Sequence, residues 1–335
     1  MKADKILQKS WVVAALAILC CALWGSAFPS IKIGYQLFAI PSDAPGSQIL
    51  FAGIRFTLAG ILTVLFGSLL KRKWIGLRRE AVGKVVKLCL LQTALQYFFF
   101  YIGLAHTSGV KGSIIVGTNS LISILVASLL FRQEKLTAKT LMGCLIGLCG
   151  VIAANLDGSG IGLDMSFTGE GFVLLSVVAY AFSSVLMKIY ATDDDPVMLS
   201  GYQFIFGGLL LAAAGLLLGG KISLPQGAAA LDGAASFAQG TAAVQTGAAW
   251  QALSVLFYLA FLSAAAYTVW GILLKYNPVS KVAVYGFANP VFGVFLSAFL
   301  LGEAGQAFTL KNVAALGLVC IGILVVNVRC AGREQ

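Results

Sequence analysis

Long apolar stretches, separated by short polar connections, run along nearly the whole chain. Ten of them approach the roughly 20 residues that a helix needs to cross the hydrocarbon core of a membrane. A backbone in lipid must satisfy its amides within its own segment, and the short alternating strands of a β-barrel are missing, so each stretch is predicted to be a helix. The predicted spans are 11–37, 47–70, 84–104, 109–131, 138–156, 170–190, 196–218, 249–273, 280–301 and 309–328.

Composition supports this interpretation, because 59% of the 335 residues are hydrophobic, only 11% are charged, and the mean hydropathy is +0.92. A soluble domain carries about 25% charged residues. So few charges would not cover the surface of a soluble fold of this length. The sequence therefore predicts an all-α integral membrane protein with the lipid bilayer as its surroundings. The first stretch loosely resembles a cleavable signal peptide, but it stays apolar well past residue 27, which favours a retained helix.

The net charge of +10 comes from basic residues that gather in the short connections. In a soluble chain this excess would suggest nucleic-acid binding. Here it follows the positive-inside rule, by which Lys and Arg mark cytoplasmic loops, and no nucleic-acid partner is expected. The densest connection, 71–87, and both chain ends fall on the same side. We expect a multi-pass protein of the plasma (inner) membrane with both termini in the cytoplasm.

The two halves of the chain resemble each other, since ALWGSAFPSIKI at 22–33 aligns with VAYAFSSVLMKI at 178–189. Each half holds five predicted spans, so the second half must insert upside down, as in transporters built from inverted repeats. The predicted units are 11–156 and 170–328, joined by an external linker at 157–169, with a low-complexity external insert at 219–248. The aligned pairs include Trp24 with Tyr180, Lys32 with Lys188, Arg55 with Gln203, and Glu134 with Glu303.

A set of short motifs recurs in order along both halves. It comprises Trp24 to Phe28 with Lys32, Arg55–Phe56, the fourth stretch ending in Glu134, Gly143 to Gly150, Asn289–Pro290, Glu303 and Gly322. In these features the chain resembles the EamA family of the drug/metabolite transporter superfamily. The resemblance implies ten helices with inverted pseudo-symmetry, a central cavity, and transport of small metabolites, often export of amino acids or related compounds. One position departs from it: Leu121 aligns with Pro290, which leaves a helix break in the fourth span open.

Two cations inside predicted spans are the strongest candidates for a substrate site. Charges within the membrane are costly and usually mark function. Trp24, Phe28 and Lys32 are spaced by four and drift only about 80° around a helix, so they are candidates for one stripe of a cavity. With Arg55, Lys32 would form a cationic site for a carboxylate. The alternatives are that Lys32 snorkels to the headgroups and that Arg55 clamps carbonyls at helix ends.

Aromatic and amide side chains in other spans are candidates for stacking on a substrate and bonding its polar end. The alternative for them is packing and interfacial belts. Glu134 is predicted to cap a neighbouring helix, with a gate as the alternative, and Asp193 to Asp195 to form a turn rather than a metal site. The aromatic and amide candidates are Gln96, Tyr97, Tyr101, Asn119, Tyr180, Gln203, Tyr267, Trp270 and Asn289.

Enzymatic motifs are missing from the chain: it has no phosphate loop and no triad order, and its seven cysteines and single histidine have no metal-ligand spacing. We therefore expect no enzyme activity, catalytic residue, cofactor or metal. The sequence favours a carrier that moves a small-molecule substrate by alternating access and exports amino acids or related carboxylates. A channel, a non-transporting sensor and a lipid-modifying membrane enzyme are the alternatives. Nothing in the sequence fixes an oligomeric state.

Overall fold

The computed structural model describes residues 5–41, 43–107, 112, 115–155, 166–223, 248–300 and 310–327. Every regular element in these ranges is a helix, which confirms the all-helical prediction. In chain order the helices are α2 (Ser10–Leu37), α3 (Pro45–Lys71), η1 (Arg79–Ala81), α4 (Val82–Leu88), η2 (Cys89–Leu95), α5 (Gln96–Ala105), α7 (Asn119–Leu125), η3 (Val126–Leu130), α8 (Ala138–Asn155), η4 (Phe167–Gly171), α9 (Phe172–Asp193), α10 (Pro196–Leu217), α12 (Ala248–Tyr276), α13 (Val279–Ala283), η6 (Val284–Phe287), α14 (Ala288–Leu300) and α16 (Leu310–Asn327).

Six helical stretches within the described ranges are long and apolar enough to cross a membrane. They are Ser10–Leu37, Pro45–Lys71, Arg79–Leu104, Phe167–Asp193, Pro196–Leu217 and Ala249–Tyr276. Three further apolar helices are shorter: Ile115–Leu130, Ala138–Ala153 and Val313–Asn327. The ninth predicted span, 280–301, consists of the consecutive pieces α13, η6 and α14.

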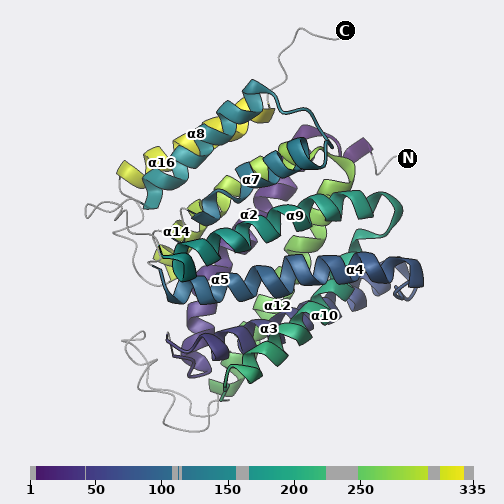
Figure 1. Ribbon diagram of the computed structural model, residues 1–335, viewed down its shortest axis with the longest axis vertical. Helices are drawn as coiled ribbons and strands as arrows, with labels where there is room; N and C mark the ends of the chain where they lie inside the picture. Colours follow the sequence, from purple (N-terminus) through teal and green to yellow (C-terminus); the bar gives the residue numbers. More distant parts are fainter. Residues whose placement is uncertain are drawn as a thin grey trace.

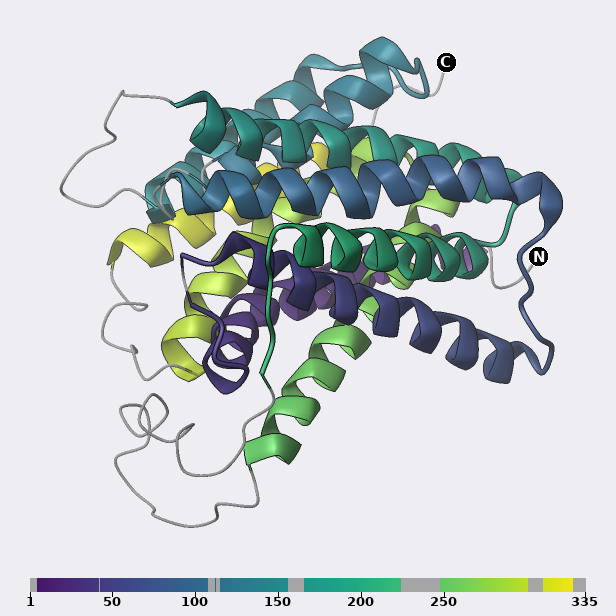
Figure 2. The same cartoon turned by 60° about the horizontal axis from the view of Figure 1, so that its bottom comes forward.

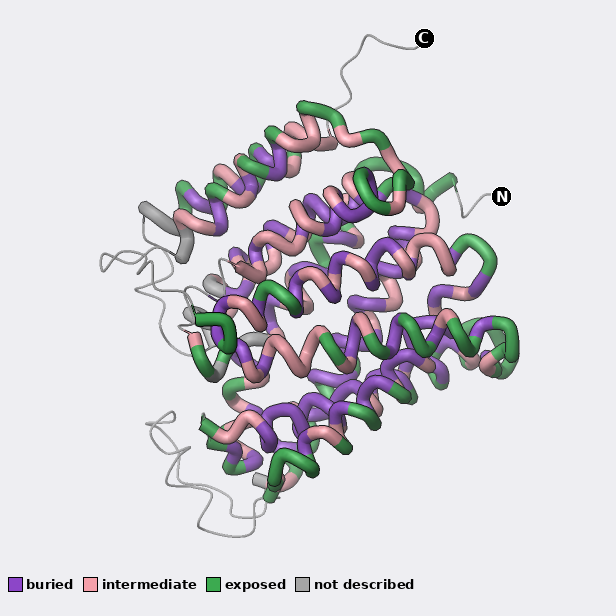
Figure 3. Tube along the Cα trace, in the orientation of Figure 1, coloured by how far each residue is buried: buried purple, intermediate pink, exposed green. Residues whose placement is uncertain are grey.

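Large apolar side chains lie exposed on the outside of the bundle. Leu70 is 87% exposed, Leu217 88%, Trp250 73% and Trp11 70%. Figure 3 shows how exposed positions recur along the outer helices while buried positions face inward. A soluble fold would hide such side chains, whereas lipid solvates them, so this surface fits a protein inside a bilayer.

Helices α3 and α10 pack backbone to backbone along their length (Figure 1). A β-carbon placed on Gly53 would lie 2.3 Å from the backbone nitrogen of Ala212. One placed on Gly208 would lie 2.4 Å from the nitrogen of Thr57. Small residues at such crossings let membrane helices approach closely and gain van der Waals contact. These two helices therefore form a closely packed pair.

Helices α8 and α16 form a second close pair at the margin of the bundle, side by side in Figure 1. A β-carbon on Gly143 would lie 2.9 Å from the carbonyl oxygen of Gly322, and one on Gly150 would lie 2.9 Å from that of Ala315. The Gly143-x-x-x-Gly147 spacing, which is typical of closely packed membrane helices, therefore lies at a helix contact in this structure.

The remaining helices form the centre of the molecule between these two pairs. On one side α2 packs against α12 and α14, and on the other side α9 packs against α5 and α7. Figure 2 shows α5 and α9 running alongside each other, while the beginning of α12 runs obliquely to them. The central helices and Arg55 of α3 line the cavity described below, and no described residue of the α8–α16 pair does.

The fourth and ninth predicted spans are both interrupted within their first half. In the fourth, the helical residues 115–117 end at a turn, and α7 begins at Asn119. The hydroxyl of Thr118 donates to the carbonyl of Ile115 at 2.6 Å, a local bond that competes with helix continuation. In the ninth, the 3₁₀ turn η6 separates α13 from α14, which carries Pro290 in its first turn. The fourth span is therefore interrupted although it has Leu121 where the ninth span has Pro290.

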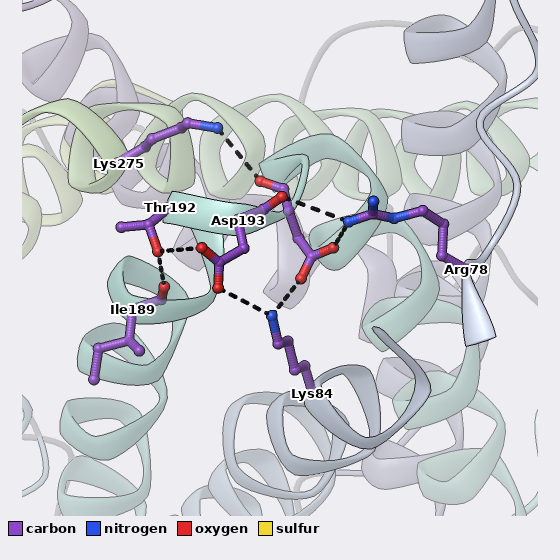
Figure 4. Close-up of polar contacts among 7 residues, drawn as sticks. Arg78, Lys84, Ile189, Thr192, Asp193 and Lys275 are labelled. Atoms are coloured by element: carbon purple, nitrogen blue, oxygen red, sulfur yellow. Dashed lines mark hydrogen bonds and ion pairs between the residues drawn. The ribbon is translucent and has the colours of Figure 1, made fainter. Parts of the chain in front are cut away.

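An acidic turn joins α9 to α10 and is held by cations from two other segments. Asp194 is only 3% exposed. Its carboxylate accepts a hydrogen bond from Lys84 at 2.7 Å and another from Arg78. Lys275 donates to its carbonyl at 3.4 Å. Figure 4 shows Arg78, Lys84 and Lys275 reaching this turn from different sides, next to Asp193. The acidic run therefore binds protein cations.

Two acidic residues cap helices: Glu134, as the sequence predicts, and Asp195 at the end of the predicted acidic turn. Asp195 is the N-cap of α10, where its side chain accepts from the backbone nitrogen of Val197 at 3.2 Å. Glu134 accepts from the backbone nitrogen of Ser280 at 2.9 Å and from its hydroxyl at 2.7 Å, in the first turn of α13. The aligned Glu303 lies outside the described residues, as do most of the linker 157–169 and of the insert 219–248.

Candidate functional site

A cavity of about 150 Å³ lies at the centre of the bundle, between the two halves of the chain. An apolar cavity of roughly this volume holds one molecule the size of benzene, so this one suits a single small metabolite. Its lining consists of Trp24, Ala27, Ile31, Arg55, Gln96, Tyr97, Phe100, Tyr101, Val116, Asn119, Ser120, Ser123, Ser176, Tyr180, Ser184, Leu262, Ser263, Tyr267, Trp270, Leu274, Val279, Ala283, Gly286, Asn289 and Pro290.

Among the described residues that line the cavity, Arg55 is the only charged one. It lies on α3 and is 3% exposed. Its guanidinium carbon is 4.4 Å from the centroid of the Phe56 ring and 5.9 Å from that of Tyr97. No described residue forms an ion pair with it, and its Nε has no hydrogen-bond partner among them. A buried guanidinium thus faces the cavity against aromatic rings.

Four aromatic side chains form a connected wall. The hydroxyls of Tyr97 and Tyr267 lie 2.7 Å apart. The ring of Trp24 has its centroid 5.0 Å from that of Tyr267 and 5.0 Å from that of Trp270. Edge-to-face and tilted contacts of this kind are the favoured packing of aromatic rings. The wall joins α5, α2 and α12 and gives the cavity an apolar side next to Arg55.

Amide and hydroxyl groups line other parts of the cavity. Gln96 Oε1, Asn119 Oδ1, Asn289 Oδ1 and Ser123 Oγ are buried and lack a hydrogen-bond partner among the described residues. An unsatisfied buried polar atom is costly, so a cluster of them around one cavity is typical of a place where a polar ligand binds. The lining also contains serines that sequence reasoning missed: Ser120, Ser123, Ser176, Ser184 and Ser263.

The structure brings most of the candidate residues together. Those that line the cavity are Trp24, Arg55, Gln96, Tyr97, Tyr101, Asn119, Tyr180, Tyr267, Trp270 and Asn289. Phe28 lies on α2, but its side chain is outside the described residues.

Two candidates lie elsewhere. Lys32 is on the exposed side of α2, because eight residues after Trp24 the helix has turned it away, and Ile31 faces the cavity instead. This position fits the snorkelling alternative. Gln203 is fully buried and accepts a hydrogen bond from Thr93 at 2.7 Å, so it ties α10 to η2.

Lys188, which aligns with Lys32, has different surroundings. Its ammonium donates to the carbonyls of Leu274 at 3.3 Å and of Asn277 at 2.5 Å, at the end of α12. A lysine in this place satisfies carbonyls that the end of a helix leaves free. The aligned lysines therefore occupy unlike environments in this structure.

Comparison with known proteins gives a consistent result. The profile of the EamA-like transporter family matches residues 11–156 and 167–328. An "Uncharacterized transporter" of Archaeoglobus fulgidus is 25% identical over 95% of this chain and 99% of its own. The "Uncharacterized inner membrane transporter YedA" of Escherichia coli is 25% identical over 91% of this chain and 87% of its own. A solved structure titled "Crystal structure of protein", 19% identical, superposes with a TM-score of 0.67 over 94% of this chain and 98% of that one, which shows the same fold.

Proposed function

Since the chain belongs to the EamA-like transporter family, we propose that it carries small organic carboxylates, amino acids above all, out of the cell. It is a multi-pass membrane protein and a transporter rather than an enzyme, as its relatives are named. We infer the carboxylate of the substrate from the residues of the cavity. We infer the direction of transport, export, from the family resemblance.

The observation that carries the proposal is the buried guanidinium of Arg55. A cation at 3% exposure without a counter-ion among the described residues is expensive in a low-dielectric interior. A carboxylate that enters the cavity would offset this cost through charge-assisted hydrogen bonds. The volume of about 150 Å³ favours a molecule of amino-acid size over a nucleotide or a lipid.

Alternating access requires two parts that rock around the site. We propose that these parts are 11–156 and 170–328, two inverted repeats of five helices each. The packing supports this: α3 packs on its counterpart α10, and α8 on its counterpart α16. The contacts of α2 with α12 and α14 also match those of its counterpart α9 with α5 and α7. A pseudo-two-fold axis between the halves would produce such reciprocal contacts.

The basic connection 71–87 leads us to propose that both termini and the turn at Asp194 face the cytoplasm of the plasma membrane. A cysteine that replaces Ala44, in a background without the native cysteines, should then react with an impermeant maleimide on intact cells. A cysteine that replaces Arg79 should react only after lysis. Labelling of the Arg79 variant in intact cells would reverse the proposed orientation.

The transport proposal is tested with purified protein in liposomes. Vesicles loaded with an unlabelled amino acid should accumulate the same labelled amino acid transiently, since a carrier exchanges substrate across the membrane. A library of amino acids and other small carboxylates, ranked by thermal stabilisation of the protein, selects the compounds. Stabilisation by none of them would contradict the substrate proposal, and ionic currents far above carrier turnover would indicate a channel.

A further inference from the structure

Unpartnered polar atoms of the residues that line the cavity fall into three chemical groups. The hydroxyls of Ser123 and Ser184 can either donate or accept a hydrogen bond. Arg55 Nε and Trp24 Nε1 are hydrogen-bond donors. Gln96 Oε1, Asn119 Oδ1 and Asn289 Oδ1 are neutral acceptors. None of these atoms has a partner among the described residues. A ligand that satisfies all of them must therefore both accept and donate hydrogen bonds.

Asn119 and Asn289 occupy corresponding places in the two interrupted spans. Asn119 opens α7 directly after the turn at Thr118, and Asn289 is the second residue of α14, after η6. The two breaks lie against each other, because a β-carbon on Gly286 of η6 would lie 2.7 Å from Ser120 Oγ. The irregular backbone thus brings an amide from each half of the chain to one region of the cavity lining.

The charge of the lining restricts which donor these amides accept from. The described lining contains no carboxylate, and its one charge is the positive charge of Arg55. An organic cation would lack a counter-ion there and be repelled by Arg55. A simple organic anion would pair with Arg55 but leave the amide oxygens unsatisfied. A primary ammonium group on the same molecule as the carboxylate supplies three N–H donors for the amide oxygens. The molecule then carries no net charge, so Arg55 does not repel it.

We propose that Asn119 and Asn289 form a subsite for the ammonium group of the substrate, so that the cavity selects a single zwitterionic amino acid over the corresponding carboxylic acid. This inference rests on the proposed function and specifies its substrate class. The carboxylate binds at Arg55, the ammonium binds at the two amide oxygens, and the side chain packs on the wall of Trp24, Tyr97, Tyr267 and Trp270.

The test compares three matched ligands on the wild-type protein. For threonine, leucine and phenylalanine, the affinity of the amino acid is measured against its deaminated acid and its decarboxylated amine; for leucine these are 4-methylpentanoate and 3-methylbutylamine. The best-bound amino acid should exceed its acid by about tenfold or more, because the acid lacks the charge-assisted bonds to the amides. The amine should bind most weakly.

Two variants locate the effect. Asn119→Leu and Asn289→Leu remove the acceptor at similar size, and each should reduce the preference for the amino acid over its acid to about threefold or less while the affinity of the acid stays within about twofold. The matched control is Asn327→Leu, since Asn327 also has an unpartnered Oδ1 but lies on α16, away from the cavity. It should keep the full preference.

The outcomes separate the two proposals. An acid that binds as tightly as its amino acid overturns the ammonium subsite and leaves the carboxylate proposal intact. An unchanged preference in both asparagine variants overturns the assignment to these residues. Failure of all amino acids and acids to bind contradicts the proposed function, and the subsite with it. If the asparagine variants do not fold, the comparison of amino acid and acid on the wild-type protein still decides whether the cavity binds the ammonium group.

Discussion

Arg55→Gln should give a protein that inserts and folds normally but binds its carboxylate substrate about 10–100-fold more weakly. The loss corresponds to one charge-assisted hydrogen bond of about 1.5–3 kcal/mol. Glutamine is the residue aligned at Gln203, so the change copies what the other half of the chain carries. Because no described residue forms an ion pair with Arg55, the folded state loses no counter-ion contact, and the yield should not fall. Affinity in proteoliposomes and folded yield are measured together.

Lys32→Met is the comparison variant for Arg55→Gln. It removes a cation from an exposed position on α2, outside the cavity lining. Its effect on affinity should therefore stay within about threefold, below the loss of one charge-assisted bond. Full affinity in Arg55→Gln would take Arg55 out of the site. Collapsed yield with normal affinity would instead make it the structural clamp that the sequence left open.

The sequence was sufficient to predict which charged residues lie inside the membrane spans. It was not sufficient to predict which of these side chains face the cavity. Arg55 stands out because a charge in an apolar stretch is rare, and it does line the cavity. Lys32 stands out for the same reason, but its direction depends on the rotation of α2 against its neighbours, which four-residue spacing defines only loosely. At the ends of spans, a long side chain can also satisfy itself at the headgroups.

Contacts between segments that are distant in the chain were not predictable from the sequence. Gln203 appeared as a cavity candidate because it aligns with Arg55, yet it bonds Thr93 of η2. Serine in a membrane helix is equally suited to packing and to a polar lining, so the hydroxyls of Ser123 and Ser176 gave no usable signal. Only the assembled bundle decides which face of a helix meets the cavity.

Interruptions within a span show a similar limit. Hydropathy predicts the ninth stretch as one apolar segment, but the structure divides it among α13, η6 and α14. Hydropathy measures the solvent preference of the side chains, so it does not reveal a change from α-helical to 3₁₀ hydrogen bonding in the backbone. Interrupted backbone within a membrane is tolerated where it is buried in protein or lines a cavity, and both interruptions described here lie beside the lining.

Asp194→Asn should destabilise the protein by about 1–2 kcal/mol, seen as a lower melting temperature in detergent. The carboxylate accepts charge-assisted bonds from Lys84 of α4 and from Arg78 in the connection after α3, and links both segments to the turn between α9 and α10. The side chain of Arg78 is 56% exposed and that of Lys84 29%, so water can partly replace the lost bonds and keeps the cost modest. Asp193→Asn is the matched control on the same turn. Its side chain is 73% exposed and reaches Lys84 only at 3.4 Å, so its effect should stay within about 0.5 kcal/mol.

The stability difference between wild type and Asp194→Asn should also depend on pH in one direction. Burial raises the pKa of Asp194, but the hydrogen bonds from Lys84 and Arg78 outweigh it and hold the pKa below its ordinary value. A carboxyl with a lowered folded-state pKa stabilises the fold fully above the unfolded-state value of about 3.9, and the contribution is lost as the pH falls below it. The difference in melting temperature should therefore be constant between about pH 6 and 8 and shrink below about pH 4. A difference that grows on acidification, or an Asp193→Asn variant that loses as much stability, would show that the Asp194 carboxylate does not hold this turn.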